Sequence, residues 1–368
     1  TVTSLTPEPA TVSKDADGNS IARYRLAPGD SVDIEAVFRI SVSAIPAQKK
    51  KDQWSDNPEL TAPKKYWESD DPLISELAHA MKTPKDIYDF VTKMITYDTN
   101  VVDTRPRIGA KGMITSVNHV GVCREFTDTF IALARAAGIP SREVIGFALS
   151  DNQRLRPVLE GGDILHAWPE YYDKDKKLWV AVDPTWGKTT GGVDYFSAMD
   201  FRHVSLAIHG TNSDAPNPPL PRVGTGQAIR ISLADTESTD VIPQNLTVRY
   251  DLPPSVKAGG KLIGTVYIEN KSGRSAQDIE IRIDSGEPHP MTITKRVAEL
   301  LPYEQVKIPI TIPIKGLFDN RSVHLRTIVN GIPTETHVTV QPLFWLIIPA
   351  MSACIAGAML WILTKKHD

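Results

Sequence analysis

The sequence predicts an α+β domain followed by an all-β domain, with one apolar helix at the C-terminus. Three observations support this prediction. Helix-like and strand-like patterns both occur between residues 72 and 212, short strand-like runs fill residues 241–341, and residues 343–363 carry no charged side chain. A chain of 368 residues has room for two or three domains of ordinary size.

The composition is that of an ordinary folded protein. A formal net charge of −3 gives no strongly basic surface, so we expect no nucleic-acid partner. The chain has only two cysteines, Cys123 and Cys354, which excludes a disulfide-rich scaffold. Its first residue is Thr1 rather than methionine, which fits either the removal of an export signal or a fragment of a longer chain.

Residues 1–45 are predicted to hold a β-hairpin. Strict alternation predicts a half-buried strand whose apolar side chains are Val32, Ile34, Ala36, Phe38, Ile40 and Val42. Residues 21–27 would pair with this strand across the turn signal Pro28-Gly29-Asp30. Two strands alone are marginally stable, so we expect them to pack on another part of the protein or on another chain. Residues 46–71 are polar and are predicted to be a linker.

A helix is predicted over residues 124–137, with its first turn at or just after Cys123. Gly138 and Pro140 supply the usual stop signals, and the apolar stripe is Phe126, Phe130, Leu133, Ala134 and Ala137. A thiol at a helix N-terminus faces unpaired backbone N–H groups and the positive end of the helix dipole, which favour the thiolate. Arg124 could add to this effect. The same N–H groups could hold the oxyanion of a tetrahedral intermediate.

A second hairpin is predicted from residues 167–172 and 177–182, joined by a loop at residues 173–176. A four-residue loop would place Tyr172 opposite Lys177 and His166 directly opposite Asp183, on the same face of the sheet. The other face would be almost entirely apolar, as expected of a core side. A slip of one residue would send Asp183 to the opposite face from His166.

Cys123, His166 and Asp183 together supply the parts of a nucleophilic site. The thiolate would attack an acyl carbon, the imidazole would move protons, and the carboxylate would orient the imidazole. Each residue alone has a commoner structural explanation, as a packed thiol, a strand-end histidine and a turn-starting Asp-Pro. Their predicted convergence favours catalysis. They lack the close ligand spacing of zinc motifs, so no metal is predicted.

Several short motifs accompany these three residues. In chain order they are Asp86-Ile87-Tyr88-Asp89-Phe90-Val91 with Ile95-Thr96-Tyr97-Asp98, Gly121-Val122-Cys123-Arg124-Glu125-Phe126, Ala134-Arg135-Ala136-Ala137-Gly138-Ile139-Pro140, His166-Ala167-Trp168-Pro169-Glu170 and Val182-Asp183-Pro184-Thr185-Trp186-Gly187. In this order, residues 72–209 resemble the transglutaminase-like core of the papain-like cysteine enzymes. The resemblance covers well under half of the chain.

The resemblance implies a papain-like fold, in which the helix carrying Cys123 packs on an antiparallel sheet carrying His166 and Asp183. It also implies Cys123 as the nucleophile, His166 as general base and acid, and Asp183 as the orienting carboxylate. Animal transglutaminases use a tryptophan ahead of the cysteine to hold the oxyanion, but none stands between Trp67 and Cys123. No acidic loop has calcium-ligand spacing, so neither calcium nor another cofactor is expected.

The outcome of the reaction is left open by the sequence. A lysine amine would release the acyl group from Cys123 as an isopeptide cross-link, whereas water would release it as in a protease or amidase. We expect a protein, peptide or cell-wall amide as substrate. Arg154 and Arg156 in the loop at residues 150–163 could bind a substrate carboxylate or simply face solvent. The candidate substrate-binding residues are Trp168, Arg124, Arg154 and Trp186.

Residues 213–240 are predicted to be a stiff linker, because four prolines lie between residues 216 and 221. Beyond it, residues 241–341 are predicted to form an Ig-like β-sandwich that serves as a spacer. Its short strands are expected at residues 246–250, 261–270, 278–284, 306–314, 323–329 and 335–341.

Residues 342–364 are predicted to be a transmembrane helix. The 21 uncharged residues from 343 to 363 would span about 30 Å of hydrocarbon, with Trp345 and Trp361 near its ends. The basic tail at residues 365–368 would then lie in the cytoplasm and the remainder outside the cell membrane. Small residues at i and i+4 in the helix, such as Ser352 and Ala356, could support self-association.

The sequence therefore predicts a single-pass, outward-facing cysteine enzyme that acts on amide bonds through an acyl-enzyme on Cys123. The alternative is a non-catalytic surface scaffold, or a peptide-binding or adhesion protein, in a membrane assembly. The rate at which Cys123 reacts with an alkylating reagent separates the two.

Overall fold

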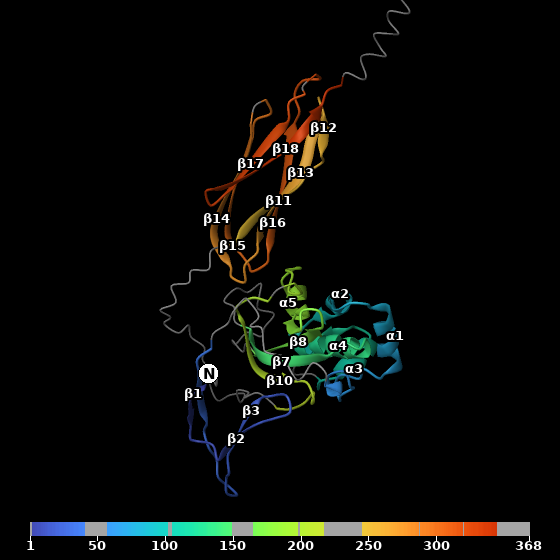
Figure 1. The fold of residues 1–368 in the computed structure, drawn as a ribbon, viewed down its shortest axis with the longest axis vertical. Helices are drawn as coiled ribbons and strands as arrows, with labels where there is room; N and C mark the ends of the chain where they lie inside the picture. The colour runs from blue at the N-terminus through green and yellow to red at the C-terminus, as the bar shows by residue number, and fades with distance from the viewer. Residues whose placement is uncertain are drawn as a thin grey trace, which may run out of the picture. The chain divides into compact units, whose positions relative to one another are not determined.

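The computed structural model of the protein describes residues 2–40, 57–101, 105–148, 165–197, 199–216, 245–286, 288–318 and 320–343. It divides into two units, Thr1–Val241 and Ile242–Asp368 (Figure 1). Each unit has its own hydrophobic core. The described part of the first unit contains both helices and strands, and strands make up the described part of the second. The α+β and all-β characters predicted for the two parts are confirmed.

The first unit contains a four-stranded antiparallel sheet. It consists of β7 (Ser141–Ala148), β8 (Leu165–Asp173), β9 (Leu178–Ala181) and β10 (His203–His209), in the spatial order β10-β7-β8-β9. β10 therefore pairs with the first strand of the sheet, not with its neighbour in sequence. Because of this pairing, residues that follow residue 200 lie next to β7, which in turn pairs with β8.

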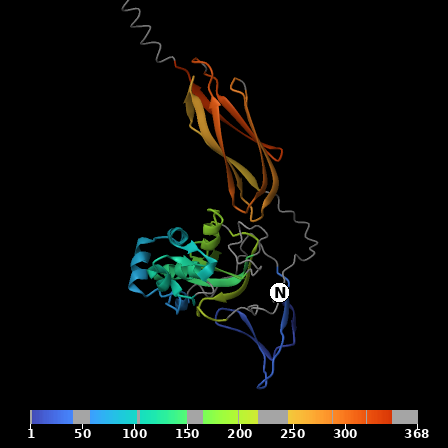
Figure 2. The ribbon, with the colours of Figure 1, turned by 180° about the vertical axis from the view of Figure 1, so that it is seen from behind.

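Helices gather on one side of this sheet, as Figures 1 and 2 show. They are α1 (Pro72–Ala80), α2 (Pro84–Met94), α3 (Gly109–Thr115) and α4 (Cys123–Ala136). The central helix is α4, because it contacts β7, β8 and each of the other three. Phe126, Phe130, Ile131 and Leu133 of α4 have no exposed surface. Burial of each such side chain contributes about 1.5–3 kcal/mol, so this packing fixes α4 firmly.

Three helices of this unit begin in the same way, with a capping oxygen followed by proline. Asp71 caps α1, Thr83 caps α2, and Asp183 caps α5 (Pro184–Thr189), and each side chain accepts a backbone N–H of the first turn. Proline suits the first helical position because its missing N–H would have no intrahelical partner there. Asp183 therefore stabilises the start of α5, independently of any role in chemistry.

The start of α4 is fixed by a short parallel pair, β5 (Thr96–Tyr97) and β6 (Val120–Gly121), in which Tyr97 lies opposite Gly121. A Cβ atom added at Gly121 would lie 2.7 Å from Cβ of Glu125 and 2.9 Å from Cε of Met113. Only glycine allows the chain to pass so close to α4 as it enters the helix.

The register predicted for the β8–β9 hairpin is wrong by two residues. Tyr172 pairs with Trp179 rather than Lys177, and Asp173 pairs with Leu178. The reason lies in the turn: the Asp173 carboxylate accepts the N–H groups of Asp175 and Lys176, and Lys177 adopts φ of 55°. A shift of two keeps every side chain on its expected face.

The pairing predicted for the N-terminal strands is also wrong. β4 (Glu35–Phe38) pairs with β1 (Val2–Thr6), while β3 (Ser20–Arg23) pairs with β2 (Thr11–Lys14). The turn after β2 closes this second pair, because Asp15 accepts the N–H groups of Asp17 and Asn19. The side chains of β4 are exposed rather than half-buried.

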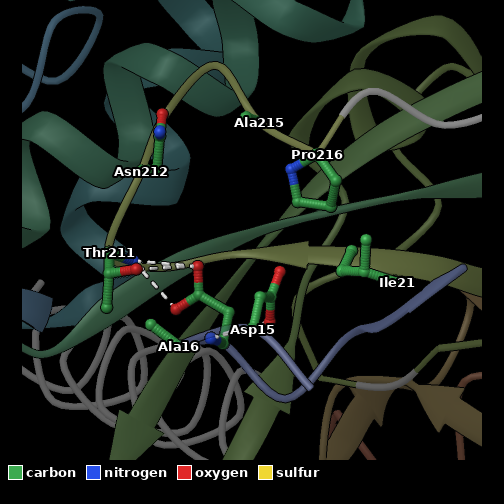
Figure 3. A pocket seen from close by; sticks show the side chains of 8 residues that line it. Asp15, Ala16, Ile21, Thr211, Asn212, Ala215 and Pro216 are labelled. Carbon is green, nitrogen blue, oxygen red and sulfur yellow. Dashed lines mark hydrogen bonds between the residues drawn. The ribbon is translucent and has the colours of Figure 1, made fainter. Parts of the chain in front are cut away.

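The β2–β3 hairpin packs on the chain that ends β10. Asn19 donates to the carbonyl of Ile208 at 2.7 Å and accepts its N–H at 2.8 Å, and Asp17 accepts the N–H groups of Gly210 and Thr211. A pocket lies between the two segments (Figure 3). Its labelled side chains are Asp15, Ala16, Ile21, Thr211, Asn212, Ala215 and Pro216.

The linker predicted at residues 46–71 is wrong over its described part. Residues 57–71 pack into the first core, where Leu60 is 2% exposed and Trp67 is fully buried. The indole N–H of Trp67 donates to Asp128 of α4 at 2.9 Å. Burial of the large aromatic side chain of Trp67 holds this segment in the core although most of its residues are polar. Residues 46–56 and 217–240 lie outside the described residues.

The described residues of the second unit form two packed sheets. One is ordered β11-β13-β16 and the other β12-β18-β17-β14-β15, and one apolar cluster with side chains from both sheets lies between them. The strands are β11 (Leu246–Asp251), β12 (Ser255–Lys257), β13 (Lys261–Asn270), β14 (Ala276–Ser285), β15 (Met291–Leu300), β16 (Gln305–Pro313), β17 (Val323–Val329) and β18 (Ile332–Gln341). The sequence interpretation missed β12 and β15. β15 was missed because exposed polar side chains dominate it.

Among the described residues, no helix combines the length and the apolar character needed to cross a membrane. The predicted transmembrane segment, apart from its first two residues, lies outside the described part of the chain.

Candidate active site

Cys123 is the first residue of α4 and is half-buried. The first backbone bonds of the helix run from the N–H groups of Glu125 and Phe126 to the carbonyl of Val122. The N–H groups of Cys123 and Arg124 come before these residues and have no partner within the helix. They can therefore donate hydrogen bonds to a bound group. This is the arrangement predicted for a nucleophile beside an oxyanion site.

Both ends of α4 are held by specific interactions. At its start, the buried Glu125 carboxylate accepts the N–H of Val122 at 2.9 Å. At its end, Gly138 adopts φ of 74°, its N–H donates to Arg135, and the N–H of Ile139 donates to Ala134. This is a Schellman motif, which ends the helix where the sequence predicted. The position of Cys123 is therefore set by a rigid element.

His166 and Asp183 form a buried pair. The Nε2 atom of His166 lies 2.8 Å from Oδ2 of Asp183, and the two side chains are 6% and 0% exposed. His166 comes from β8, beside Gly146 of β7. Asp183 lies beyond the end of β9 and caps α5, where its Oδ1 accepts the N–H of Trp186 at 2.9 Å. The predicted pair is present, but a helix cap rather than a directly opposed strand position creates it.

The third member of the group is Cys123, which interacts with His166 closely enough to help raise the pKa of its imidazole. Because Nε2 of His166 bonds Asp183, Nδ1 is left for Cys123. The three residues predicted as nucleophile, base and orienting carboxylate are thus connected in that order.

Charge explains the protonation of this group. Burial disfavours the charged form of His166, but the Asp183 carboxylate and the Cys123 thiol outweigh it and raise the pKa of His166 to about 10. Burial likewise acts against ionised Asp183, yet His166 and His203 lower the pKa of Asp183 well below its usual range. A histidine that stays protonated at neutral pH is the electrostatic partner of a thiolate.

A second histidine, which the sequence interpretation missed, bonds the same carboxylate. Nε2 of His203, at the start of β10, lies 3.0 Å from Oδ2 of Asp183. Its Nδ1 lies 2.7 Å from Oδ1 of Asp200. The only local signal is the pair Asp200 and His203, three residues apart, and nothing in the sequence connects it to Asp183.

Aromatic rings enclose the two histidines. The ring of Trp168 stacks on His166 at 5.9 Å between centroids, and Trp186 lies 5.9 Å from His166 and 4.7 Å from His203. Trp168 and Trp186 are only 3% and 2% exposed. These two predicted substrate contacts therefore pack against the imidazoles and exclude water from them.

The other candidate substrate contacts lie in different places. Arg124 is the second residue of α4, next to Cys123, and is half-buried. Arg154 and the loop at residues 150–163 lie outside the described residues. Tyr97 is a further neighbour of the thiol. Burial, followed by the charges of Cys123 and Asp183, raises the pKa of Tyr97 far above its usual value, so its hydroxyl keeps its proton.

Within the described residues, His166, Asp183 and His203 are one group whose donor atoms could surround a metal ion, since these atoms lie within 4.8 Å of one another. Contacts of 2.8 and 3.0 Å are ordinary hydrogen-bond lengths. His166 also interacts with Cys123. We therefore assign the group to hydrogen bonding and not to metal ligation.

Comparison with known proteins gives one family match. A model of the transglutaminase-like superfamily matches residues 71–184, which include Cys123, His166 and Asp183. No curated protein matches the chain.

Similar solved structures include a Cytophaga hutchinsonii protein named as a cysteine protease, with 25% identity and a TM-score of 0.31 over 40% of this chain and 45% of that one. The chain thus spans less than half of that protein. Another is the metal-bound CARDB domain of a Pyrococcus furiosus protein, with 16% identity and a TM-score of 0.23 over 27% of this chain and 89% of that one. These TM-scores are too low to establish a shared fold.

The geometry of Cys123, His166 and Asp183 and the family match concern the same part of the chain. Residues 71–184 form a transglutaminase-like superfamily domain.

Proposed function

We propose that the protein is a cysteine enzyme that cleaves or exchanges amide bonds through an acyl-enzyme on Cys123. The observation that carries this proposal is the connection of a half-buried thiol at a helix start to a buried histidine–carboxylate pair. The superfamily match to the same residues supports it. The alternative, a non-catalytic scaffold or binding protein, would need none of these bonds.

The reaction follows from the geometry. The Cys123 thiolate attacks the amide carbon, and the negative oxygen that develops is held by the N–H groups of Cys123 and Arg124. The imidazolium of His166 donates its Nδ1 proton to the leaving nitrogen, which departs as an amine or as ammonia. His166 then takes a proton from water or an amine, whose attack breaks the thioester. Asp183 keeps Nε2–H of His166 bonded throughout and so holds the ring in position.

Reactivity of the thiol is the first test. Iodoacetamide should label Cys123 within minutes near neutral pH, and faster than free cysteine. Cys123→Ala should abolish this fast label uptake and turnover while circular dichroism stays unchanged. Labelling no faster than that of free cysteine, or full turnover by the alanine variant, would sink the enzyme proposal and favour the scaffold.

The fate of the acyl group needs a second experiment. The protein is incubated with a glutamine-containing peptide and a tagged primary amine, with Cys123→Ala as the control. Tag incorporation indicates cross-linking. Release of ammonia or of a shortened peptide without incorporation indicates hydrolysis.

Membrane anchoring is part of the proposal. The uncharged stretch at residues 343–363 and the basic residues that follow it support a single span with the catalytic unit outside. The second unit, with its two packed sheets, would then be an Ig-like spacer between enzyme and membrane. Carbonate extraction of membranes and protease access to intact cells test this, since a peripheral or inward-facing protein would be extracted or protected.

A further inference from the structure

His203 has a carboxylate oxygen on each of its ring nitrogens. Nε2 lies 3.0 Å from Asp183 and Nδ1 lies 2.7 Å from Asp200. A neutral imidazole has one N–H and one lone pair, so one of these contacts would set a lone pair against an anionic oxygen. Only the imidazolium, which has two N–H groups, satisfies both.

The surroundings of His203 hold this arrangement in place. Its side chain is 3% exposed, and Trp186 and Trp168 meet its ring edge to face at 4.7 and 5.1 Å. Asp200 is fixed in turn, because it accepts the hydroxyl of Tyr195 at 2.9 Å and the N–H of Arg202 at 2.9 Å.

The charges around His203 favour its protonated form. The titratable groups that face it are Asp183, Asp200, His166 at 5.7 Å between ring centroids and Tyr195 at 6.0 Å. Cys123 lies beyond His166. Burial opposes the charge on His203, but Asp200 and Asp183 together raise its pKa. One buried imidazolium also gives each of the two buried carboxylates a partner of opposite charge.

We propose that His203 is a positioning residue of the catalytic group, held as an imidazolium between Asp200 and Asp183. It fixes the Asp183 carboxylate, whose Oδ1 is already bonded to Trp186, so that Oδ2 stays directed at His166. It also takes part of the charge of Asp183 and thereby keeps His166 from binding its proton too tightly. Its effect on turnover rests on the proposed function, whereas its protonation does not.

Protonation is tested by nuclear magnetic resonance of the chain labelled with ¹⁵N in histidine, in a Cys123→Ala background that cannot turn over. His203→Gln identifies the signals. Both ring nitrogens of His203 should carry protons throughout about pH 5–9. With Asp200→Asn, His203 should titrate inside that range. A His203 with one bare nitrogen at neutral pH in the Cys123→Ala protein overturns the proposal, whatever the activity of the enzyme.

The influence of His203 on His166 is tested by the rate of Cys123 alkylation against pH. The upper inflection of this profile reports loss of the His166 proton. In His203→Gln it should move upward by about one pH unit, because a positive charge near Asp183 is lost. Asp200→Asn, which retains all side-chain volume, should move it in the same direction.

His209→Gln is the matched control for losing a buried histidine. His209 bridges Glu143 and the carbonyl of Pro216 and does not bond Asp183. Its loss should leave the upper inflection in place. An unchanged inflection in folded His203→Gln and Asp200→Asn proteins would show that His203 is merely structural.

Discussion

The Asp183 carboxylate accepts three hydrogen bonds with its two oxygens. Oδ1 accepts the N–H of Trp186 at the start of α5, and Oδ2 accepts from His166 and His203. One carboxylate therefore starts a helix and orients an imidazole. Its replacement should affect both stability and activity, and the two effects can be separated by the choice of substituent.

Asp183→Asn is expected to reduce the alkylation rate of Cys123 and any turnover by about 10²–10⁴-fold, because the amide cannot stabilise the imidazolium. The amide oxygen can still cap α5, so the loss of stability should stay near 1 kcal/mol. Kinetics and urea unfolding of the same samples measure the two effects. Asp175→Asn, in the exposed turn, is the control, and near-wild-type activity of the Asp183 variant would contradict the assigned role.

Activity should hold on the alkaline side until the pH approaches 10. The folded-state pKa of His166 is raised to about 10, so the imidazolium that protonates the leaving group in the proposed reaction persists through neutral pH and is lost above that value. A pH profile of turnover, or of the upper inflection in Cys123 alkylation, measures this. An alkaline limb near the ordinary histidine pKa of about 6.5 would mean that Asp183 does not act on His166.

Residues with a local signal could be predicted from the sequence, and those without one could not. Cys123, His166 and Asp183 each have such a signal, namely a helix start, a strand and an Asp-Pro pair, respectively. His203 does not, because its meeting with Asp183 depends on β10 returning to β7 across the sheet. That pairing includes an irregularity between Ser205 and Ala207, which pattern reading cannot place.

At the scale of elements, the β8–β9 hairpin shows which features of a hairpin can be predicted from an assumed loop length and which cannot. Alternation identified the faces correctly, and the register error of two residues left His166 and Asp183 on one face. The turn itself was misplaced because the Asp173 side chain, not residue spacing, decides where the chain reverses. The composition of the loop indicates that a turn is present, but not which side chain accepts the backbone N–H groups and so fixes the position of the turn.

Gly146 of β7 lies so close to β10 that a larger residue would displace the neighbouring backbone. A Cβ atom there would lie 1.9 Å from the carbonyl oxygen of Val204 and 3.0 Å from Cα of Ser205. Because these are backbone atoms of β10, that strand and His203 at its start must move. Gly146→Ala should lower the free energy of unfolding by about 1–3 kcal/mol and slow the alkylation of Cys123.

The matched control is Gly286→Ala, where an added Cβ meets nothing within 4 Å. It should leave both measurements unchanged. Wild-type stability in Gly146→Ala would contradict the close approach of β7 and β10.

At the scale of the whole molecule, the two cores share no residue. The core of the second unit could be predicted, because its buried residues alternate along strands such as β16 and β17. The packing of residues 57–71 into the first core could not, because a long-range contact of Trp67 with α4 has no period in the sequence.

Independent cores predict independent unfolding. Ile281→Ala, at a site 1% exposed in β14, should destabilise the second unit by about 2–5 kcal/mol. The alkylation rate of Cys123 in the native protein should not change. Two-step thermal unfolding followed by circular dichroism, with only one step shifted, is the expected result. A single cooperative transition that moves as a whole would contradict it.

The chain order of the candidate catalytic residues has a consequence for biosynthesis. Cys123 emerges from the ribosome before His166, Asp183 and His203, and the last of these arrives only when β10 can pair with β7. A growing chain therefore carries an ordinary thiol until its sheet is closed. The group around Cys123 is complete only after the sheet has formed, so we expect a truncated or stalled chain to lack the thiol reactivity of the finished protein.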